Sequence, residues 1–268
     1  MRRALIAAIL LFTPLVGRAA APDPLAEARR LYNLGQYDAA EKWARDAATT
    51  PSRADAARVV IGRILLERYR QSANPRDLAL ARESIRTVDA MALDPSERVE
   101  LMVGQAEALY LEQRYGAAAE LFESVRQRSA LLGSAAHQRV LDWWATALDR
   151  QAQSRLADER NAIYQRILDR MAEEIAEHPG STAAGYWLAA AARSTGDLER
   201  AWNAALAGWL RAVVADDRGA ALRADLDRLV TQAIIPERAA RLASKNDLKE
   251  ATTTMRNEWE QFKRGWSK

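Results

Sequence analysis

The stretch Leu31–Pro51 reads LYNLGQYDAAEKWARDAATTP and decides the fold that the sequence predicts. Gly35 follows a short apolar-periodic segment, where a helix can end in a left-handed conformation at little cost to glycine. Ala39–Thr49 then predicts a second helix. Pro51 can begin a further helix, because the first helical position needs no N–H. The stretch is therefore interpreted as the turn and second helix of a helical hairpin.

The hairpin pattern recurs along the chain, and helices separated by Gly, Pro or Asp turns are expected throughout. The first ten are expected at Leu25–Leu34, Ala39–Thr49, Ala54–Gln71, Arg76–Leu93, Arg98–Gln113, Ala117–Ser129, Ala135–Gln153, Leu156–Glu177, Thr182–Ser194 and Leu198–Ala215. Three more are expected at Asp217–Ala233, ended by Ile234-Ile235-Pro236, at Glu237–Ala243, and from a capping box at Asp247–Glu250 to about Gly265.

Composition agrees with an all-α fold. Of the 268 residues 49% are hydrophobic, while the 12 glycines and 8 prolines lie mostly between the apolar-periodic segments. Strand patterns are sparse, and a chain of this length can bury one large or extended core. Asp94, Pro95 and Glu97 together predict a capped helix start, with Asp94 as the cap and Glu97 reaching back to it.

The recurring pattern resembles the tetratricopeptide repeat, a helix–turn–helix unit of 34 residues. Three copies carry the resemblance: Gly35, Tyr37, Ala40 and Ala47; then Tyr115, Ala118 and Phe122; then Leu188, Ala189, Gly196, Ala201 and Ala205. The resemblance covers roughly residues 25–215, with irregular spacing between copies. It implies a right-handed α-α solenoid, a superhelix of about five hairpins, closed by a helical C-terminal cap.

The beginning of the chain predicts export. Arg2-Arg3 is a short basic segment, Ala4–Val16 is apolar, and Gly17-Arg18-Ala19 places small residues around a cleavage site. The apolar run is shorter than the roughly 20 residues of a membrane-spanning helix. We therefore expect residues 1–19 to be a cleaved signal peptide and the mature protein to be soluble in the bacterial periplasm or secreted. Because the chain has no cysteine, lipid attachment and disulfides are excluded.

The change in composition along the chain predicts two domains after the signal peptide. Residues 20–215 are expected to form the repeat domain, and residues 216–268 a C-terminal helical cap or appendage, where four of the lysines lie. The signal carries three of the 39 basic residues and no acid, which leaves 36 basic against 36 acidic residues. A mature chain without net charge argues against a nucleic-acid partner.

No motif predicts catalysis, a cofactor or a metal. The chain has no cysteine, no GxSxG, HExxH or glycine-rich phosphate loop, and only two histidines. His137 near a helix start and His178 beside Pro179 are interpreted as helix termini or surface positions. We therefore expect no catalytic, cofactor-binding or metal-ligating residues, although paired carboxylates distant in sequence stay open as a possibility.

The resemblance implies a concave groove lined by the first helix of each repeat. Carried onto this sequence, the groove candidates are Arg29, Asn33, Arg63, Glu107, Tyr110, Asp149, Tyr186 and Arg193. Their mixed charges favour a protein or peptide ligand over a polyanion. Reversing the charges of Arg29, Arg63 and Arg193 is expected to weaken partner binding.

Aromatic residues offer a second candidate surface. Trp143, Trp187 and Trp202 are expected to fill the space between repeats. In the last helix Trp259, Phe262 and Trp266 make an apolar stripe at helical spacing, which either closes the end of the solenoid or binds a partner. A third role for this helix is the assembly of a structural oligomer.

The sequence thus favours a non-enzymatic, exported scaffold or adaptor that binds a protein or peptide during assembly or secretion at the cell envelope. The alternative is an enzyme acting on cell-wall polymer, or the helical accessory domain of one. A deep cleft with two facing carboxylates would favour the enzyme. The oligomeric state and the identity of the partner stay open.

Overall fold

The computed structural model describes residues 23–215, 217–244 and 247–266 of the 268. Over these ranges the regular structure is helical and no strand occurs, which confirms the all-α prediction. The predicted signal peptide, residues 1–19, lies outside the described residues.

Within the described ranges, no helix combines the length and the apolar character needed to cross a bilayer.

The helices are α1 (Pro24–Asn33), α2 (Tyr37–Ala47), α3 (Ala54–Ser72), α4 (Pro75–Arg86), α5 (Pro95–Leu111), α6 (Tyr115–Arg126), α7 (Ser134–Gln153), α8 (Ala157–Glu177), α9 (Thr182–Ser194), α10 (Leu198–Arg211), α11 (Ala220–Leu229), α12 (Ile235–Leu242) and α13 (Leu248–Trp266). Short 3₁₀ turns occupy Pro51–Arg53, Ala90–Ala92, Ser129–Leu132 and Ala212–Val214, and a π-helical turn occupies Val230–Ile234.

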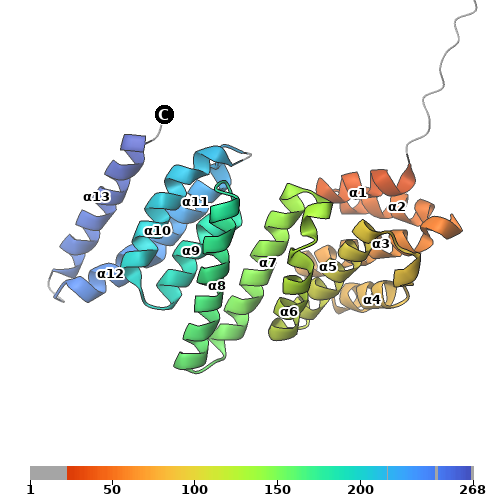
Figure 1. Ribbon diagram of the computed structural model, residues 1–268, viewed down its shortest axis with the longest axis horizontal. Coiled ribbons are helices and arrows are strands. Elements are labelled where there is room, and N and C mark those ends of the chain that lie inside the picture. Colours follow the sequence, from red (N-terminus) through yellow and green to blue (C-terminus); the bar gives the residue numbers. More distant parts are fainter. Residues whose placement is uncertain (1–22, 216, 245–246, 267–268) are drawn as a thin grey trace, which may run out of the picture.

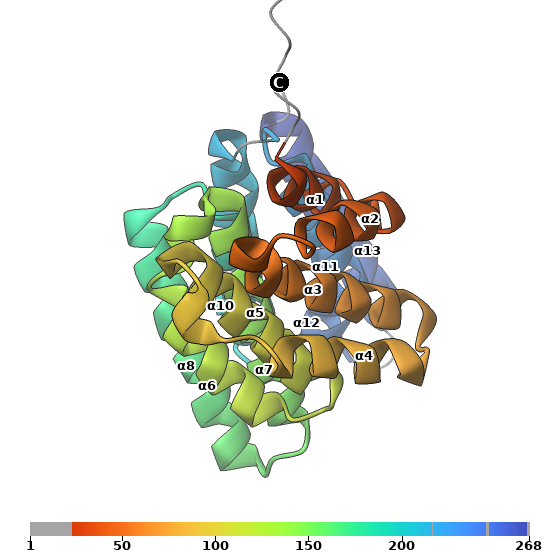
Figure 2. The same cartoon turned by 90° about the vertical axis from the view of Figure 1, so that its right-hand side faces the viewer.

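Helices that follow one another in the chain pack as neighbours, so that the molecule is a row running from α1 at one end to α13 at the other (Figure 1). The odd-numbered helices α1, α3, α5, α7, α9 and α11 also contact one another in succession. In the view along the row, α1 to α4 stand in front and α13 lies behind (Figure 2). The odd-numbered helices therefore form one continuous layer, with the even-numbered helices packed on it.

The core divides into two clusters that meet at α5. The N-terminal cluster extends from Leu25 to Ala108 and consists of buried Ala, Val, Ile and Leu. The second extends from Val99 to Trp259 and adds buried tryptophan, tyrosine and phenylalanine. Because α5 contributes to both clusters, it joins the two halves of the row.

The predicted turns at Gly35 and Gly196 and the predicted helix start at Asp94 are confirmed. Gly35 and Gly196 adopt left-handed conformations with φ of 71° and 83°, each directly before the second helix of its pair. Asp94 accepts a hydrogen bond from the backbone N–H of Glu97, and the Glu97 side chain accepts one from the N–H of Asp94. This reciprocal capping box begins α5, as the sequence predicts.

The predicted helix end at Leu93 is wrong, because α4 ends at Arg86. The Asp89 carboxylate accepts a hydrogen bond from the backbone N–H of Met91 at 2.9 Å, and this local bond favours a turn over further helix. A short 3₁₀ turn at Ala90–Ala92 follows.

The prediction that Ile234-Ile235-Pro236 ends a helix is also wrong. The backbone stays helical from Ala220 to Leu242 through the π-helical turn, in which the N–H of Ile235 bonds to the carbonyl of Val230. This wider turn leads directly into α12, which holds Pro236 in its first turn, where a proline is tolerated. The helix also begins at Ala220 instead of Asp217, because the Asp217 carboxylate accepts the N–H groups of Gly219 and Ala221 as a cap.

Candidate functional site

Two adjoining cavities lie along the layer of odd-numbered helices, and together they are called the groove here. The first, of about 250 Å³, is lined by α1, α3, α5 and α7. The second, of about 550 Å³, is lined by α7, α9 and α11. Arg139 on α7 lines both cavities. The groove therefore spans both halves of the row.

The structure places five of the eight groove candidates in these cavities. Four of them, Arg29, Asn33, Arg63 and Glu107, line the first cavity, and Tyr186 lines the second. Side chains distant in the sequence are thus brought to one surface.

The other three candidates line neither cavity and contact neighbouring helices of the protein instead. The Tyr110 ring packs edge-on against Trp143, with centroids 4.8 Å apart. Asp149 accepts a hydrogen bond from the Tyr164 hydroxyl at 2.8 Å. Arg193 Nε donates to Glu237 at 2.9 Å.

The charges in the first cavity largely neutralise one another. Arg29 Nη2 lies 2.7 Å from a carboxylate oxygen of Glu100 and 3.3 Å from one of Glu97. Arg63 lies 3.3 Å from Glu107 and stacks on the Tyr32 ring at 4.8 Å. These arginines hold α1, α3 and α5 together, and reversing the charge of Arg63 would disturb the fold before it tested binding.

Burial raises the pKa of the Glu107 carboxyl above its usual range, against the opposing effect of the Arg63 guanidinium. The Glu107 residue is only 4% exposed. The pair is therefore a structural contact that water barely reaches.

Arg139 differs from these arginines because its side chain is exposed and has no hydrogen bond or ion pair among the described residues, although its charge acts through space on the Glu107 carboxyl. It stands where the two cavities meet. An arginine guanidinium in this position offers several N–H donors to a ligand carboxylate. Arg139 is not among the residues that the repeat pattern indicated, since only the packing of α5 against α7 places it in the groove.

The second cavity combines aromatic, apolar and acidic residues. Tyr186 lines it, and the Trp187 indole N–H donates to Asp142 at 2.8 Å. Asp225, also in the cavity, lies 3.4 Å from Arg228. Two carboxylates thus share one cavity, as a hydrolase would need, but each is already bound by a neighbouring side chain.

The three residues of the C-terminal stripe have different environments. Trp259 is fully buried, and its ring lies 5.3 Å from that of Trp209 and 5.8 Å from that of Phe262. Phe262 is partly buried against the same core, while Trp266 is 59% exposed. The first two residues therefore attach α13 to the rest of the row, and Trp266 stays at the surface.

A polar contact adds to this attachment. The Trp259 indole N–H donates to Asp227 at 2.8 Å, and Lys263 Nζ lies 2.6 Å from the same carboxylate oxygen. Burial acts to raise the pKa of Asp227, but the hydrogen bonds from Lys263 and Trp259 outweigh it and lower that pKa below its usual range.

A third group of polar residues, His137, Glu174 and His178, is called the histidine cluster here. His137 Nε2 lies 3.2 Å from both carboxylate oxygens of Glu174, and His178 Nδ1 lies 3.3 Å from one of them. The two imidazole rings are 5.9 Å apart. One ligand atom from each residue lies within 4.8 Å of the others.

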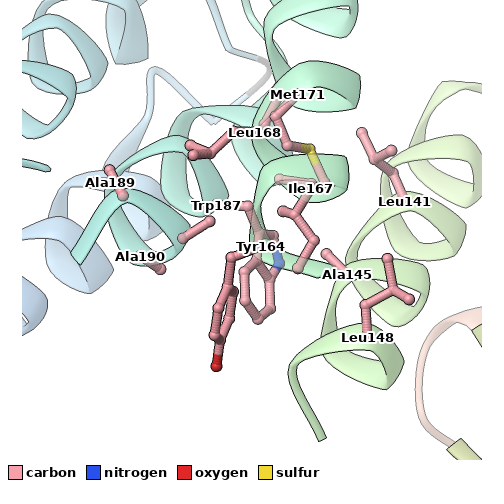
Figure 3. Packing of buried hydrophobic residues seen from close by; sticks show 14 of the residues in the cluster. Leu141, Ala145, Leu148, Tyr164, Ile167, Leu168, Met171, Trp187, Ala189 and Ala190 are labelled. Atoms are coloured by element: carbon pink, nitrogen blue, oxygen red, sulfur yellow. The ribbon is translucent and has the colours of Figure 1, made fainter. Parts of the chain in front are cut away.

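The histidine cluster is held by the hairpin of α7 and α8. Leu141 on α7 faces Ile167 and Met171 on α8 in the second core cluster, and this packing fixes how the two helices meet (Figure 3). Antiparallel helices joined by a short turn bring together residues equally distant from that turn. His137 and Glu174 lie 18 and 19 residues from Arg155 in the turn.

His137 and His178 were interpreted from the sequence as helix termini or surface positions, and they do lie near the start of α7 and at the end of α8. Their approach to each other was not predicted. Two signals pointed to it: the hairpin symmetry, and the spacing of four between Glu174 and His178, which places them on one helix face.

Burial acts to raise the pKa of the Glu174 carboxyl, but hydrogen bonding with His137 and the nearby imidazoles outweigh it and lower that pKa. A cavity of about 760 Å³ adjoins the histidine cluster and is lined by both histidines. This cavity also shares Gln138, Thr182 and Ala221 with the groove. The cluster therefore has access to solvent next to the groove.

Comparison of the chain with family models, curated proteins and solved structures finds no match in any of the three.

Proposed function

We propose that this protein is a non-enzymatic scaffold or adaptor that binds a segment of a protein or peptide in its groove. The proposal includes the finer fold, a right-handed solenoid of tetratricopeptide type closed by α12 and α13, and export to the periplasm or beyond. The contacts among successive odd-numbered helices support such a solenoid.

Arg139 carries the proposal. It is exposed, has no ion-pair partner among the described residues, and stands where the two cavities meet. A guanidinium so placed binds a carboxylate through paired hydrogen bonds. Beside it the second cavity provides Tyr186 and Leu222 for an apolar side chain. The expected ligand is therefore an extended segment with an acidic residue next to an apolar one.

A photo-crosslinking amino acid tests where the partner binds. It is placed at Gln232, exposed in the second cavity, and separately at Leu80, exposed on α4 away from the groove. In the native host, the Gln232 position is expected to capture one protein that the Leu80 position does not. Capture of the same proteins at both positions would contradict binding in the groove.

The captured protein then allows a measurement of affinity. Arg139→Glu is expected to weaken binding at least about tenfold, because a charge-assisted hydrogen bond is replaced by repulsion. Arg76→Glu is the matched control, since Arg76 is exposed on α4 and likewise has no ion-pair partner among the described residues. Equal affinities for the two variants would overturn the proposal.

Asp142 and Asp225 give the enzymatic alternative its one supporting observation, because both line the second cavity. Asp142 is nevertheless bound by Trp187 and Asp225 by Arg228. Hydrolysis of cell-wall polymer that is lost in Asp142→Asn and in Asp225→Asn would favour the enzyme over the adaptor.

A further inference from the structure

We infer that the histidine cluster is a Zn²⁺ site in which His137, Glu174 and His178 ligate one ion. The inference goes beyond the proposed function, because binding in the groove requires no metal. Two imidazole nitrogens and one carboxylate oxygen form a ligand set that suits Zn²⁺, whereas Mg²⁺ and Ca²⁺ prefer oxygen ligands alone.

The distances fit a tetrahedral ion closely. Ligands about 2.1 Å from a tetrahedral zinc lie about 3.4 Å from one another. One carboxylate oxygen of Glu174, Oε1, lies 3.2 Å from His137 Nε2 and 3.3 Å from His178 Nδ1. All three ligand atoms lie within 4.8 Å, so the two imidazole nitrogens need to approach by at most about 1.4 Å. His178 has room to move, since its side chain is 58% exposed.

The hydrogen bonds of Ser129 determine which nitrogen of His137 faces the ion. The buried Ser129 hydroxyl donates its one hydrogen to the backbone carbonyl of Arg126 at 2.7 Å. It therefore accepts from His137 Nδ1–H, which lies at 2.8 Å. In the neutral ring, Nε2 then presents a lone pair toward the Glu174 carboxylate. Two such acceptors approach each other only with a cation between them, either a proton or a metal ion.

The carboxylate is positioned in the same way. Gln138 Nε2 donates to Glu174 at 3.3 Å. The Gln138 side-chain oxygen accepts from the Ser181 hydroxyl at 2.8 Å and from the Ala183 N–H at 3.3 Å, which fixes the orientation of the amide. Partners of this kind, bonded to the ligands rather than to the ion, orient the ligands of protein zinc sites. Ser129 and Gln138 would do so here.

The adjoining cavity leaves one side of the ion open. His137 and His178 line its wall, so an ion held by them and Glu174 would face about 760 Å³ of space, large enough for a water molecule or a small ligand group. A zinc ion here would connect the start of α7 to the end of α8 and to the Pro179–Ser181 turn. Three ligands with an open fourth position differ from the closed four-ligand sites of purely structural zinc.

Calorimetric titration of Zn²⁺ into the mature chain, free of any histidine tag, tests the inference. We expect one ion per chain with micromolar or tighter affinity. His178→Ala, a change at an exposed side chain, is expected to weaken binding at least about tenfold. Glu173→Gln is the matched control, because the exposed Glu173 carboxylate is next to Glu174 in sequence but pairs with Arg170 and does not belong to the cluster. Absence of binding below about 100 μM, or equal binding by His178→Ala, would overturn the inference.

Two further measurements examine the geometry. Co²⁺ bound to the wild-type chain is expected to give the intense visible absorption of a four- or five-coordinate ion, and His178→Ala is expected to lose it. Ser129→Ala, with both histidines intact and its fold checked by circular dichroism, is expected to weaken Zn²⁺ binding about 10- to 100-fold. Unchanged affinity in Ser129→Ala would contradict the assignment of Nε2 as the ligating nitrogen.

Discussion

Glu107 in the N-terminal half and Glu174 in the middle of the row are both 4% exposed, and each faces a nitrogen base on a neighbouring helix. Glu107 faces Arg63, whose charge is permanent, whereas Glu174 faces His137, whose charge depends on a bound proton. The first pair is therefore complete within the protein. The second pair presents a carboxylate oxygen and an imidazole nitrogen, both of which can ligate a metal ion.

The surroundings of the two carboxylates differ accordingly. The Arg63 side chain is covered by the Tyr32 ring and is only 12% exposed. Arg63 and Glu107 line the smaller first cavity, of about 250 Å³. The histidine cluster borders a cavity of about 760 Å³, and its His178 side chain is 58% exposed. The Arg63–Glu107 pair is therefore a structural contact, whereas His137 and Glu174 form a candidate ligand site. The two differ because an imidazole can ligate a metal ion and a guanidinium is permanently charged.

The largest expected effect is at Glu107. Glu107→Ala would leave the Arg63 charge buried without a partner, and breaking such a pair costs about 3–5 kcal/mol of unfolding free energy. Urea denaturation measures the loss. The double change Arg63→Met with Glu107→Leu is expected to recover most of it, because an apolar pair replaces the buried charges. A loss of unfolding free energy below about 1 kcal/mol would contradict the prediction, because it would show that water solvates the Arg63 charge in Glu107→Ala.

The next largest effect is the stabilisation by Zn²⁺, which tests whether the histidine cluster acts independently of the Arg63–Glu107 pair. Zn²⁺ at about a hundred times its dissociation constant would stabilise the chain by about 2.7 kcal/mol. Wild type and Glu107→Ala are expected to gain the same increment in urea denaturation with and without Zn²⁺, because they share an intact histidine cluster. His178→Ala is expected to gain little. Unequal increments for the first two would show that the sites are coupled.

A smaller loss is expected for Glu174→Ala, about 1–3 kcal/mol when measured with a chelator at neutral pH. Without the carboxylate, His137 keeps its hydrogen bond with Ser129, whereas Arg63 without Glu107 keeps a permanent buried charge. The comparison with Glu107→Ala is the decisive readout. A loss as large as that of Glu107→Ala would contradict the distinction between the two bases.

The smallest effect concerns a third carboxylate, Asp227, which faces Lys263. Its pKa is lowered in the folded protein. Its contribution to stability is therefore complete above the unfolded value of about 3.9 and is lost as the pH falls through the lowered folded value. Asp227→Asn is expected to be less stable than wild type at pH 7, with the difference shrinking at pH 3.

Urea denaturation at the two pH values measures this difference. Glu258→Gln, which changes an exposed carboxylate on α13, controls for the loss of one charge. A difference between wild type and Asp227→Asn that is equally large at pH 3 would contradict the lowered pKa of Asp227.

Local patterns predicted most helices well, because their signals lie within a few residues. Gly35, Gly196 and the Asp94–Glu97 box mark helix ends with contacts that cross no other element. The failures at Arg76–Leu93 and at Pro236 arose where a competing local bond or a wider helical turn replaced the expected geometry.

The candidate sites could be predicted only in part. Placing Arg29 and Arg63 on first helices was enough to bring them to one cavity. It did not indicate that Glu97, Glu100 and Glu107 already neutralise them. Ion pairs between helices depend on how the helices cross, which the sequence pattern does not contain.

By itself, the sequence determined an all-α chain of paired helices, since helix ends and apolar periodicity are local properties. Only the tertiary structure decided which distant side chains meet. It brought His137 within 3.2 Å of Glu174, 37 residues away, and it buried Trp259 against Trp209. Such contacts follow from helix lengths, crossing angles and the packing of buried side chains, which are properties of the whole row of helices.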